Sequence, residues 1–445
     1  MKISRISVED LFYTYTYTIQ LSKKPVSIIH APNGYGKTTV FKLIRDIFNL
    51  DIKGLYEIPF KSFSVELDNG QCINLTKNKP EPDQIDREPI KMTFTIVLNN
   101  KQEKSIKLQV RESIIDFYKG NYFHPPYFHS NERILRENKE IIDEIEKIRE
   151  DIAIHFIETN RLYFNNNSAF SLIDIKNDYE AFSETDFRRK KPNSSIELND
   201  RIVYYANNLK NKINQVKQEY SSFSESLDRT FPSRLVDSVN FKKQFYDEET
   251  IECKLKELDR KRAELEEIGF ISKETSSAPI QSLKNSDDTL KRFYTLYIDD
   301  TLSKLNYYNN IKEKIKLFFE IINVKTAFSN KELLINNDGK VYFMPKLKKQ
   351  GSNTEIQLQK LSSGEKHDFI LFYELIFNSD KKSIFLIDEP EISLHVAWQV
   401  EYVKILEEIC KMNGIQAIIA THSPDIVNGR DDLLISLGLE DEENG

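Results

Sequence analysis

The pattern of hydrophobic and polar positions changes repeatedly along the chain between short apolar runs and apolar residues at helical spacing. Short apolar runs rich in β-branched residues occupy 25–30, 383–388 and 415–420, and each is predicted to form a buried strand. Segments with apolar residues at helical spacing, such as 40–50 and 367–377, are predicted to form helices. Buried strands that alternate with amphipathic helices indicate an α/β fold.

Shorter patterns predict further β-structure. The segment 64–75 contains an Asp-Asn-Gly turn, and 334–343 contains an Asp-Gly turn, so both are predicted to form hairpins. Another strand is predicted at 91–99. The N-terminal part of the chain is therefore expected to be rich in β-strands.

The middle of the chain has helical periodicity and is rich in Lys, Glu, Asn and Tyr. Four apolar residues fall on a 4-3-7 spacing, interrupted by Arg262, which is typical of a coiled-coil seam. They are Ile251, Leu255, Leu258 and Leu265. A second long helix is predicted over 288–324, antiparallel to the first. A short coiled-coil hairpin and an ordinary helical subdomain are both open. The segment 227–235 is expected to break the helical region and has no chemistry assigned.

These patterns predict three parts: an N-terminal lobe at 1–165, a helical insertion at 166–330 and a C-terminal lobe at 331–445. Hydrophobic residues make up 39% and charged residues 30% of the chain, which suits long solvated helices rather than one compact ball. The formal net charge is -7, so overall charge does not indicate DNA as a partner. The basic cluster at 188–191 could touch phosphate, although a solvated charge run is the simpler interpretation.

Cysteines and apolar runs indicate the compartment. Cys72, Cys253 and Cys410 are far apart and lack the spacing of metal ligands, so they are interpreted as reduced thiols. The N-terminus lacks the apolar core of a signal peptide, and no run of roughly 18 apolar residues occurs. The expectation is a cytoplasmic protein without a membrane partner.

The loop APNGYGKTT at 31–39 joins the strand at 25–30 to a helix. Gly34 and Gly36 allow backbone angles that turn successive N–H groups toward one point, where the helix adds its positive end. Lys37 can neutralise the β- and γ-phosphates, and the Thr38 hydroxyl can hold Mg²⁺. The predicted nucleotide-binding residues of the loop are Asn33, Gly34, Tyr35, Gly36, Lys37, Thr38 and Thr39. Ala31 stands where the usual pattern has glycine.

Four further elements follow near the C-terminus. Asp388 ends a predicted strand and can hold Mg²⁺, because this hard cation prefers oxygen ligands. Glu389 is expected on the other face of the strand, where it can orient the attacking water or accept its proton. Ser362, Ser363 and Gly364 begin a helix and can bind an anion, although they could equally be a helix cap. His422 can donate a hydrogen bond to a γ-phosphate oxygen.

Together these motifs resemble the ABC-type ATPases, in particular the branch with SMC, Rad50, RecF and OLD-like proteins. The loop at 31–39 is similar to Walker A, 361–365 to the ABC signature, 384–390 to Walker B and 420–424 to the switch-histidine segment. The form DEPEISLH at 388–395, followed by Trp-Gln, resembles OLD-like and related AAA-type proteins. The resemblance implies an ABC-type head built from the two lobes, with ATP and Mg²⁺ as cofactors.

The resemblance also implies how the site is completed. In the family the signature of one protomer closes on ATP held by another, so Ser362–Gly364 would act in trans and hydrolysis would need a homodimer or a higher homo-oligomer. A family glutamine that contacts Mg²⁺ would correspond to Asn160, which has a shorter amide side chain.

Three functional hypotheses follow. The first is a bacterial antiviral-defence ATPase that controls a separate effector such as a nuclease, since the chain ends 23 residues after His422 without a fused nuclease. Within this class, the chain resembles the AriA ATPases of PARIS systems first and the PtuA ATPases of Septu systems second. The second is a DNA-repair ATPase of the RecF or Rad50 kind. The third, a transporter ATPase, is disfavoured because its two lobes would be contiguous.

Overall fold

The computed structural model describes residues 1–77, 90–97, 103–110, 139–158, 198–241, 244–271, 287–336, 338–347, 355–394 and 396–437. The chain divides into two compact units, residues 1–192 with 379–445 and residues 193–378. Among the described helices, none is both long and apolar enough to cross a membrane.

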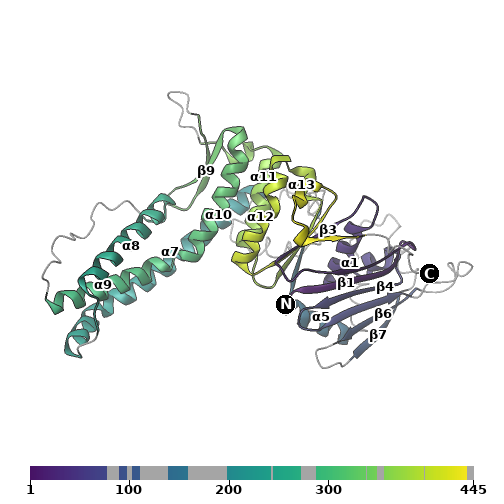
Figure 1. Cartoon of the computed structure of the whole chain (residues 1–445), viewed down its shortest axis with the longest axis horizontal. Helices are drawn as coiled ribbons and strands as arrows, with labels where there is room; N and C mark the ends of the chain where they lie inside the picture. The colour runs from purple at the N-terminus through teal and green to yellow at the C-terminus, as the bar shows by residue number, and fades with distance from the viewer. Residues whose placement is uncertain are drawn as a thin grey trace, which may run out of the picture. The chain divides into compact units, whose positions relative to one another are not determined.

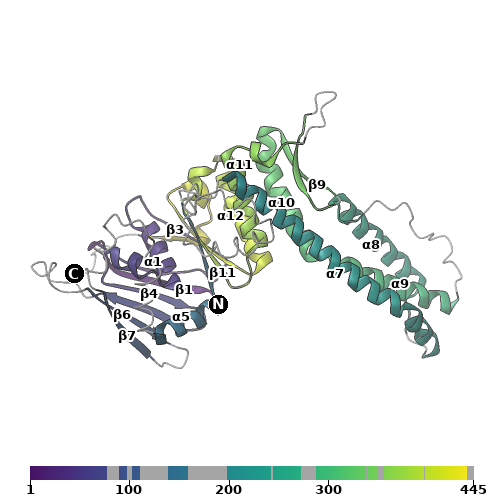
Figure 2. The same ribbon diagram turned by 180° about the vertical axis from the view of Figure 1, so that it is seen from behind.

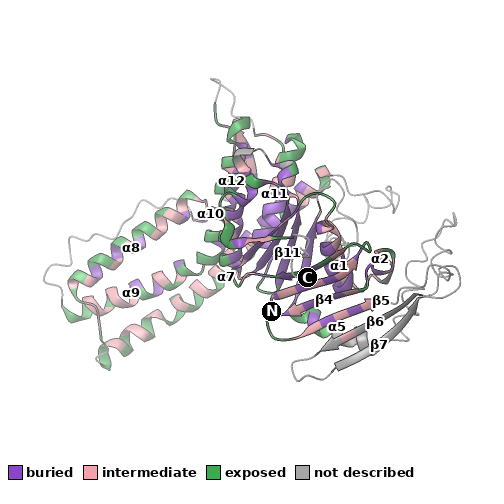
Figure 3. Cartoon of the chain, turned by 45° about the vertical axis from the view of Figure 1, so that its right-hand side comes forward, coloured by how far each residue is buried: buried purple, intermediate pink, exposed green. Residues whose placement is uncertain are grey.

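A five-stranded parallel sheet forms the centre of the first unit (Figure 1). Its strands, in spatial order, are β13 (Leu434–Ser436), β3 (Val26–His30), β12 (Gln416–Thr421), β11 (Ser383–Asp388) and β8 (Ala153–Ile157). Every residue of β11 and β12 is buried, as expected for a parallel sheet covered on both faces (Figure 3). The strands predicted at 25–30, 383–388 and 415–420 are thus confirmed.

An antiparallel sheet completes the β-structure of this unit. Its strands, in spatial order, are β2 (Tyr15–Gln20), β1 (Ile3–Leu11), β4 (Ser62–Leu67), β5 (Cys72–Lys77), β6 (Ile90–Val97) and β7 (Glu103–Val110). The pairing of Glu66 with Cys72 across the turn confirms the hairpin predicted at 64–75.

Helix α1 (Lys37–Asn49) joins the two sheets into one core. Its buried residues Val40, Phe41 and Ile44 belong to a cluster that also contains side chains of β1, β4 and β5 and of β3, β8 and β11. The remaining helices of the unit are α2 (Ile52–Glu57), α5 (Lys139–Asp151), α12 (Val396–Asn413) and α13 (Pro424–Val427), with short 3₁₀ turns η6 (Pro390–Ser393) and η7 (Asp431–Leu433). Because α1 is packed on both sides, the loop before it has a rigid base.

The second unit contains the helical insertion and the helix predicted at 367–377. Its elements are α7 (Leu198–Asn240), α8 (Glu248–Glu267), α9 (Asp288–Asn306), α10 (Asn309–Thr326), η4 (Ala327–Ser329), β9 (Lys331–Ile335), β10 (Val341–Pro345), η5 (Leu358–Lys360) and α11 (Ser363–Phe377). The β9–β10 pairing confirms the hairpin predicted at 334–343. The fold class, an α/β ATPase-type lobe interrupted by a long helical insertion, is confirmed.

The seam predicted on α8 is a packing surface. All four of its apolar residues, Ile251, Leu255, Leu258 and Leu265, are buried. Arg262, which interrupts the spacing, donates from Nη2 to the hydroxyl of Tyr297 at 3.1 Å. The polar interruption is therefore satisfied by the neighbouring helix α9.

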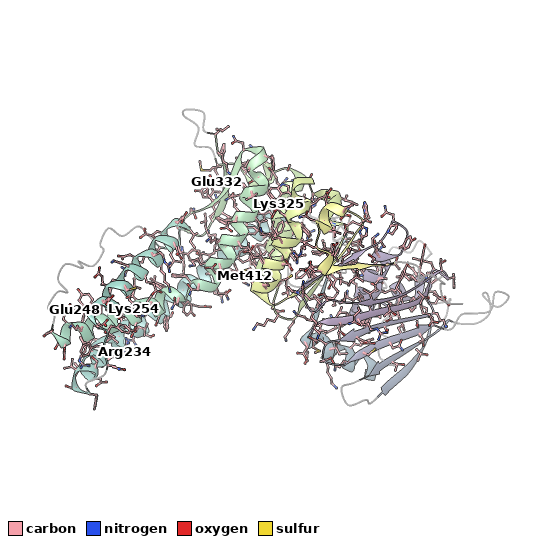
Figure 4. The ribbon with its side chains drawn as sticks, viewed as in Figure 1. Arg234, Glu248, Lys254, Lys325, Glu332 and Met412 are labelled. Carbon is pink, nitrogen blue, oxygen red and sulfur yellow. The ribbon has the colours of Figure 1, made fainter. Side chains whose placement is uncertain are left out.

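The helix predicted over 288–324 is divided into α9 and α10, and the predicted antiparallel arrangement of the two long helices is wrong. Lys291 of α9 lies beside Glu248 at the start of α8, and Lys261 lies beside Asn306 at the end of α9, so α8 and α9 are parallel. Helix α7 runs antiparallel to α9, since Arg234 pairs with Asp300 whereas the earlier residue Asp228 pairs with the later residue Lys304. The two helices lie side by side in both views (Figures 1 and 2). Figure 4 places Arg234 and Glu248 at the same end of these helices.

The expectation that 227–235 breaks the helical region is wrong, because this segment forms part of α7 despite Pro232. Proline removes one backbone N–H from a helix and disturbs the preceding turn. Here Arg234 donates from Nη2 to the carbonyl of Leu227 at 2.8 Å and holds both carboxylate oxygens of Asp300 at 2.6 Å. The segment therefore carries a structural ion pair that joins α7 to α9.

Candidate functional site

The candidate site lies at one edge of the parallel sheet. Strand β12 pairs with β3 on one side and β11 on the other, with all three parallel. Their carboxyl ends therefore lie next to one another and carry the loop at 31–36, the segment after Thr421 and the segment after Asp388. Residues from three distant parts of the sequence meet here because of this strand order.

The glycines of the loop adopt the conformations their sequence positions suggested. Gly34 and Gly36 have φ of 90° and 79°, in a backbone region that residues with a Cβ rarely adopt. A Cβ on Gly36 would lie 2.7 Å from Cδ2 of Leu11, whereas one on Gly34 would meet open space. Gly36 is thus needed both for its backbone angles and for the close approach of the β1–β2 hairpin.

Lys37 is held inside the loop. Its ammonium donates to the carbonyls of Ala31 at 2.7 Å and Pro32 at 3.0 Å. Burial lowers the pKa of Lys37, and the carboxylates of Glu389 and Asp388 act in the opposite direction. The Lys37 ammonium therefore lies near acidic groups, within the loop that would surround a phosphate.

Thr38 and Asp388 link the two lobes of the sequence within the site. The Thr38 hydroxyl donates to Oδ2 of Asp388 at 2.8 Å, and Asp388 is almost wholly buried. Two oxygen atoms at this separation fit a site for Mg²⁺, which prefers oxygen ligands and retains several waters. These residues would hold the cation.

Glu389 reaches the site by a turn of the backbone. It has a left-handed conformation with φ of 43°, and its N–H donates to the carbonyl of Ala420 at 2.8 Å. The chain leaves the strand at this residue, so the alternation of strand faces does not decide where its side chain lies. Its carboxylate lies 3.7 Å from Nδ1 of His422.

Glu391 is a residue that sequence reasoning missed. Its Oε1 accepts hydrogen bonds from Thr421 Oγ1 at 2.7 Å and from the N–H of His422 at 3.1 Å. Nδ1 of His422 also lies 3.1 Å from the same oxygen. The second acidic residue of DEPE was the available signal.

Gln399, noted only for its place in the family-like segment, supports the same region. Its amide donates to the carbonyls of Glu391 at 3.3 Å and Leu394 at 3.2 Å. Its Oε1 accepts from Ser423 Oγ at 2.8 Å, and Ser423 N–H donates to Thr421 Oγ1 at 3.0 Å. This buried network joins the segments after β11 and β12.

The turn between β1 and β2 adds two aromatic rings that the sequence did not single out. Phe12 and Tyr13 have φ of 54° and 61° and are 40% and 63% exposed. The ring of Phe12 would lie 3.6 Å from a Cβ on Gly36, so the turn borders the phosphate loop. Exposed aromatic faces of this kind can stack on a nucleotide base.

Tyr35 fastens this hairpin to the loop. Its ring stacks on that of Tyr15, with centroids 5.4 Å apart, and its carbonyl accepts from the Tyr17 hydroxyl at 3.1 Å. Asn33 is exposed and Thr39 is half-buried in the first turn of α1. The loop therefore keeps one side open while β2 fixes the other.

Ser362, Ser363 and Gly364 belong to the second unit. Ser362 is the N-cap of α11: its Oγ accepts from the N–H of Glu365 at 3.2 Å, and the Glu365 carboxylate accepts from the N–H of Ser362 at 2.8 Å. The cap uses Ser362 Oγ as an acceptor, which leaves the hydroxyl hydrogen available for an anion. A capping role and an anion-binding role are thus compatible.

Three features of the sequence lie outside the described residues: Asn160, His395 and the basic cluster at 188–191. The assignment of Asn160 to Mg²⁺ stays a prediction.

Known proteins share parts of this architecture. The AAA ATPase domain family matches residues 1–427. UvrABC system protein A of Listeria monocytogenes serotype 4b is 33% identical over 85 residues, which are 19% of this chain and 9% of that protein. The protein of the same name from Listeria innocua serovar 6a gives the same values. The chain therefore covers less than a tenth of the length of these curated relatives.

Solved structures of Smc head domains also align. One from Pyrococcus furiosus, with an extended coiled coil and bound to the C-terminal domain of ScpA, aligns over 99% of this chain and 94% of that chain, with 14% identity and a TM-score of 0.35. One from Pyrococcus yayanosii, with a coiled coil and joint, covers 98% and 94%, with 14% identity and a TM-score of 0.30.

A parallel sheet whose carboxyl edge carries a glycine loop, a lysine and a Thr–Asp pair defines an ATP-binding ATPase of the ABC/AAA type. The chain belongs to the AAA ATPase domain family, since the match spans nearly its whole length and includes Lys37, Asp388 and His422.

Proposed function

We propose that the chain binds ATP with Mg²⁺ at the carboxyl edge of the parallel sheet and hydrolyses it to ADP and phosphate. The observation that carries this proposal is the 2.8 Å contact between Thr38 and Asp388 beside the Lys37 loop. It joins a phosphate-binding loop to a buried carboxylate, the combination that phosphoryl transfer requires.

Each side chain has a separate task. Lys37 exchanges its loop carbonyls for phosphate oxygens, and Thr38 with Asp388 holds Mg²⁺, which when bound neutralises phosphate charge. Glu389 orients the attacking water and accepts its proton. His422 contacts the γ-phosphate. The main contributions are positioning and charge stabilisation, because the protein forms no covalent intermediate in this mechanism.

Self-assembly is the second part of the proposal. Ser362, Ser363 and Gly364 of one copy complete the site of another through the Ser362 hydroxyl and the N–H groups that open α11. The capped start of α11 supports this role, because it presents a hydroxyl and backbone donors at a helix N-terminus. A homodimer is the smallest assembly that satisfies this arrangement.

The assembly is proposed to act in bacterial antiviral defence, in the cytoplasm, by controlling a separately encoded effector such as a nuclease. The form of the segment at 388–395 and the moderate length of the helical insertion support this class. A repair ATPase that works directly on DNA is the alternative outcome of the test below.

The test of ATP use compares the wild type with Lys37→Ala. We expect Mg²⁺-dependent release of phosphate by the wild type and loss of both nucleotide binding and hydrolysis in the variant. Lys23→Ala, which removes an exposed lysine outside the loop, is the matched control and should behave as the wild type. Equal hydrolysis by Lys37→Ala and wild type would contradict the proposal.

The test of the biological role is the mass of the protein purified together with its chromosomal neighbours, with and without ATP and Mg²⁺. A homo-oligomer that retains a neighbour-encoded protein supports control of an effector. A monomer that dimerises only with ATP, retains no partner and binds DNA in a strongly salt-dependent manner favours the repair class.

A further inference from the structure

We propose that Glu391 is a positioning residue of the ATPase site, which fixes the ring of His422 through Nδ1 and supplies the counter-charge that lets Nε2 donate to the γ-phosphate. This inference rests on the proposed function and assigns a role to a residue outside the phosphate loop and the Asp388–Glu389 pair.

The contacts of Glu391 converge on one oxygen. Its Oε1 lies within hydrogen-bond distance of the Thr421 hydroxyl, the His422 N–H and the His422 Nδ1, at 2.7, 3.1 and 3.1 Å. Two of these contacts are hydrogen bonds that fix the start of the segment after β12, and the third is an ion-pair contact with the ring. Glu391 therefore controls both the position and the rotation of His422.

The free-energy cost of burying the Glu391 carboxylate favours a functional role for this residue. The side chain of Glu391 is 6% exposed, and its Oε2 is buried without a hydrogen-bond partner among the described residues. A buried carboxylate with an unsatisfied oxygen destabilises a fold unless a positive charge lies nearby. Burial lowers the pKa of Lys37, the charge of Glu391 acts on that ammonium in the opposite direction, and the His422 ring lies closer still at 3.1 Å from Oε1.

The hydrogen on Nδ1 is inferred from its neighbour. A carboxylate oxygen only accepts, so the 3.1 Å contact becomes a hydrogen bond when Nδ1 carries a hydrogen and donates it. In a neutral ring Nε2 then carries a lone pair, which repels a phosphate oxygen. Nε2 can donate to the phosphate only when the ring holds both hydrogens, and the negative charge of Glu391 balances that imidazolium.

A second anchor holds Glu391 itself. Gln399 of α12 donates to the carbonyl of Glu391 and accepts from the hydroxyl of Ser423, the residue after His422. These two hydrogen bonds, of 3.3 and 2.8 Å, connect the same two segments that the Glu391 carboxylate joins. Glu391 and His422 are therefore connected through side chain and backbone, so their relative position is rigid.

The test separates charge from hydrogen bonding. Glu391→Gln keeps an oxygen that can accept from Thr421 and His422 but removes the negative charge, whereas Glu391→Ala removes both. We expect Glu391→Gln to lower kcat by about 10- to 100-fold, the range found for carboxylates that orient metal-bound histidines. Its Kd for ADP should change less than about twofold, because ADP has no γ-phosphate. Glu408→Gln, on the exposed face of α12, is the matched control.

The same measurement on His422→Ala and the double variant shows whether Glu391 acts through His422. Glu391→Gln should cause no further loss in the His422→Ala background. A Glu391→Gln protein with wild-type kcat, or one that loses activity equally with and without His422, would overturn this inference. If the wild type hydrolyses no ATP, or Lys37→Ala hydrolyses it normally, the proposed function itself fails instead.

Discussion

The hydroxyl of Thr38 donates to Oδ2 of Asp388 at 2.8 Å although 350 residues separate them in the chain. Thr38 lies in the first turn of α1, and Asp388 is the last residue of β11. The contact exists because β12 places β3 and β11 on its two sides. It shows that the two ends of the sequence form one site.

The first prediction concerns the cation. Asp388→Asn keeps the shape of the side chain but removes its charge, so the Mg²⁺ concentration for half-maximal ATPase activity should rise by about 10- to 100-fold. Thr38→Val should act in the same direction, and Thr38→Ser, which keeps the hydroxyl, should remain close to wild type. An unchanged Mg²⁺ requirement in Asp388→Asn would remove this residue from the site.

The second prediction concerns the attacking water. Glu389→Gln is nearly isosteric but cannot accept the proton, so kcat should fall by about 100- to 10,000-fold while ATP binding persists. The variant should therefore accumulate as an ATP-bound assembly, visible by mass measurement in the presence of ATP. Normal turnover by Glu389→Gln would show that another group activates the water.

The third prediction concerns the loop glycines. Alanine at Gly34 or Gly36 would have to adopt a positive φ, at a cost of about 1–2 kcal/mol. Gly36→Ala adds a 2.7 Å contact with Leu11, so it should weaken nucleotide binding and lower the melting temperature more than Gly34→Ala does.

Leu11→Ala tests the cause of that difference. Removal of the Leu11 side chain should restore part of the binding and stability lost in Gly36→Ala, but none of that lost in Gly34→Ala. Calorimetry and nucleotide titration of the single and double variants measure both effects. If Leu11→Ala has the same effect in both backgrounds, the clash is not the cause.

The fourth prediction concerns pH and stability. Burial raises the pKa of Glu374 in α11 from 4.5 to about 7, although hydrogen bonds from Tyr205 and Asn378 act against it. The folded protein thus holds an extra proton between these values, so this group stabilises the fold at low pH. That stabilisation, on the order of 3 kcal/mol, is lost as the pH rises from about 4.5 to about 7.

Glu374→Gln removes the titration and tests its sign. Relative to wild type, the variant should gain stability against urea between pH 5 and pH 8, as followed by circular dichroism. Glu408→Gln, with an exposed carboxyl, should show no such gain. A constant difference between Glu374→Gln and wild type across this range would contradict the raised pKa.

Local patterns in the sequence were sufficient for several elements of the fold. Strand β11 is a continuous apolar run because both faces of a parallel strand are buried, and the four apolar residues of α8 face its neighbours as their spacing indicates. The loop at 31–36 needs glycine at two positions, and the order of residues in the sequence shows both. These properties depend on neighbours along the chain, so the sequence alone determined them.

Contacts between distant segments depended on the tertiary structure. Strand order brought Thr38 to Asp388, a left-handed turn placed Glu389, and the fold of the segment after β11 set Glu391 beside His422. The parallel course of α8 and α9 was also hidden, because a heptad pattern is the same in both directions. Periodicity reports which face of an element is buried; only the packed chain decides which residues meet there.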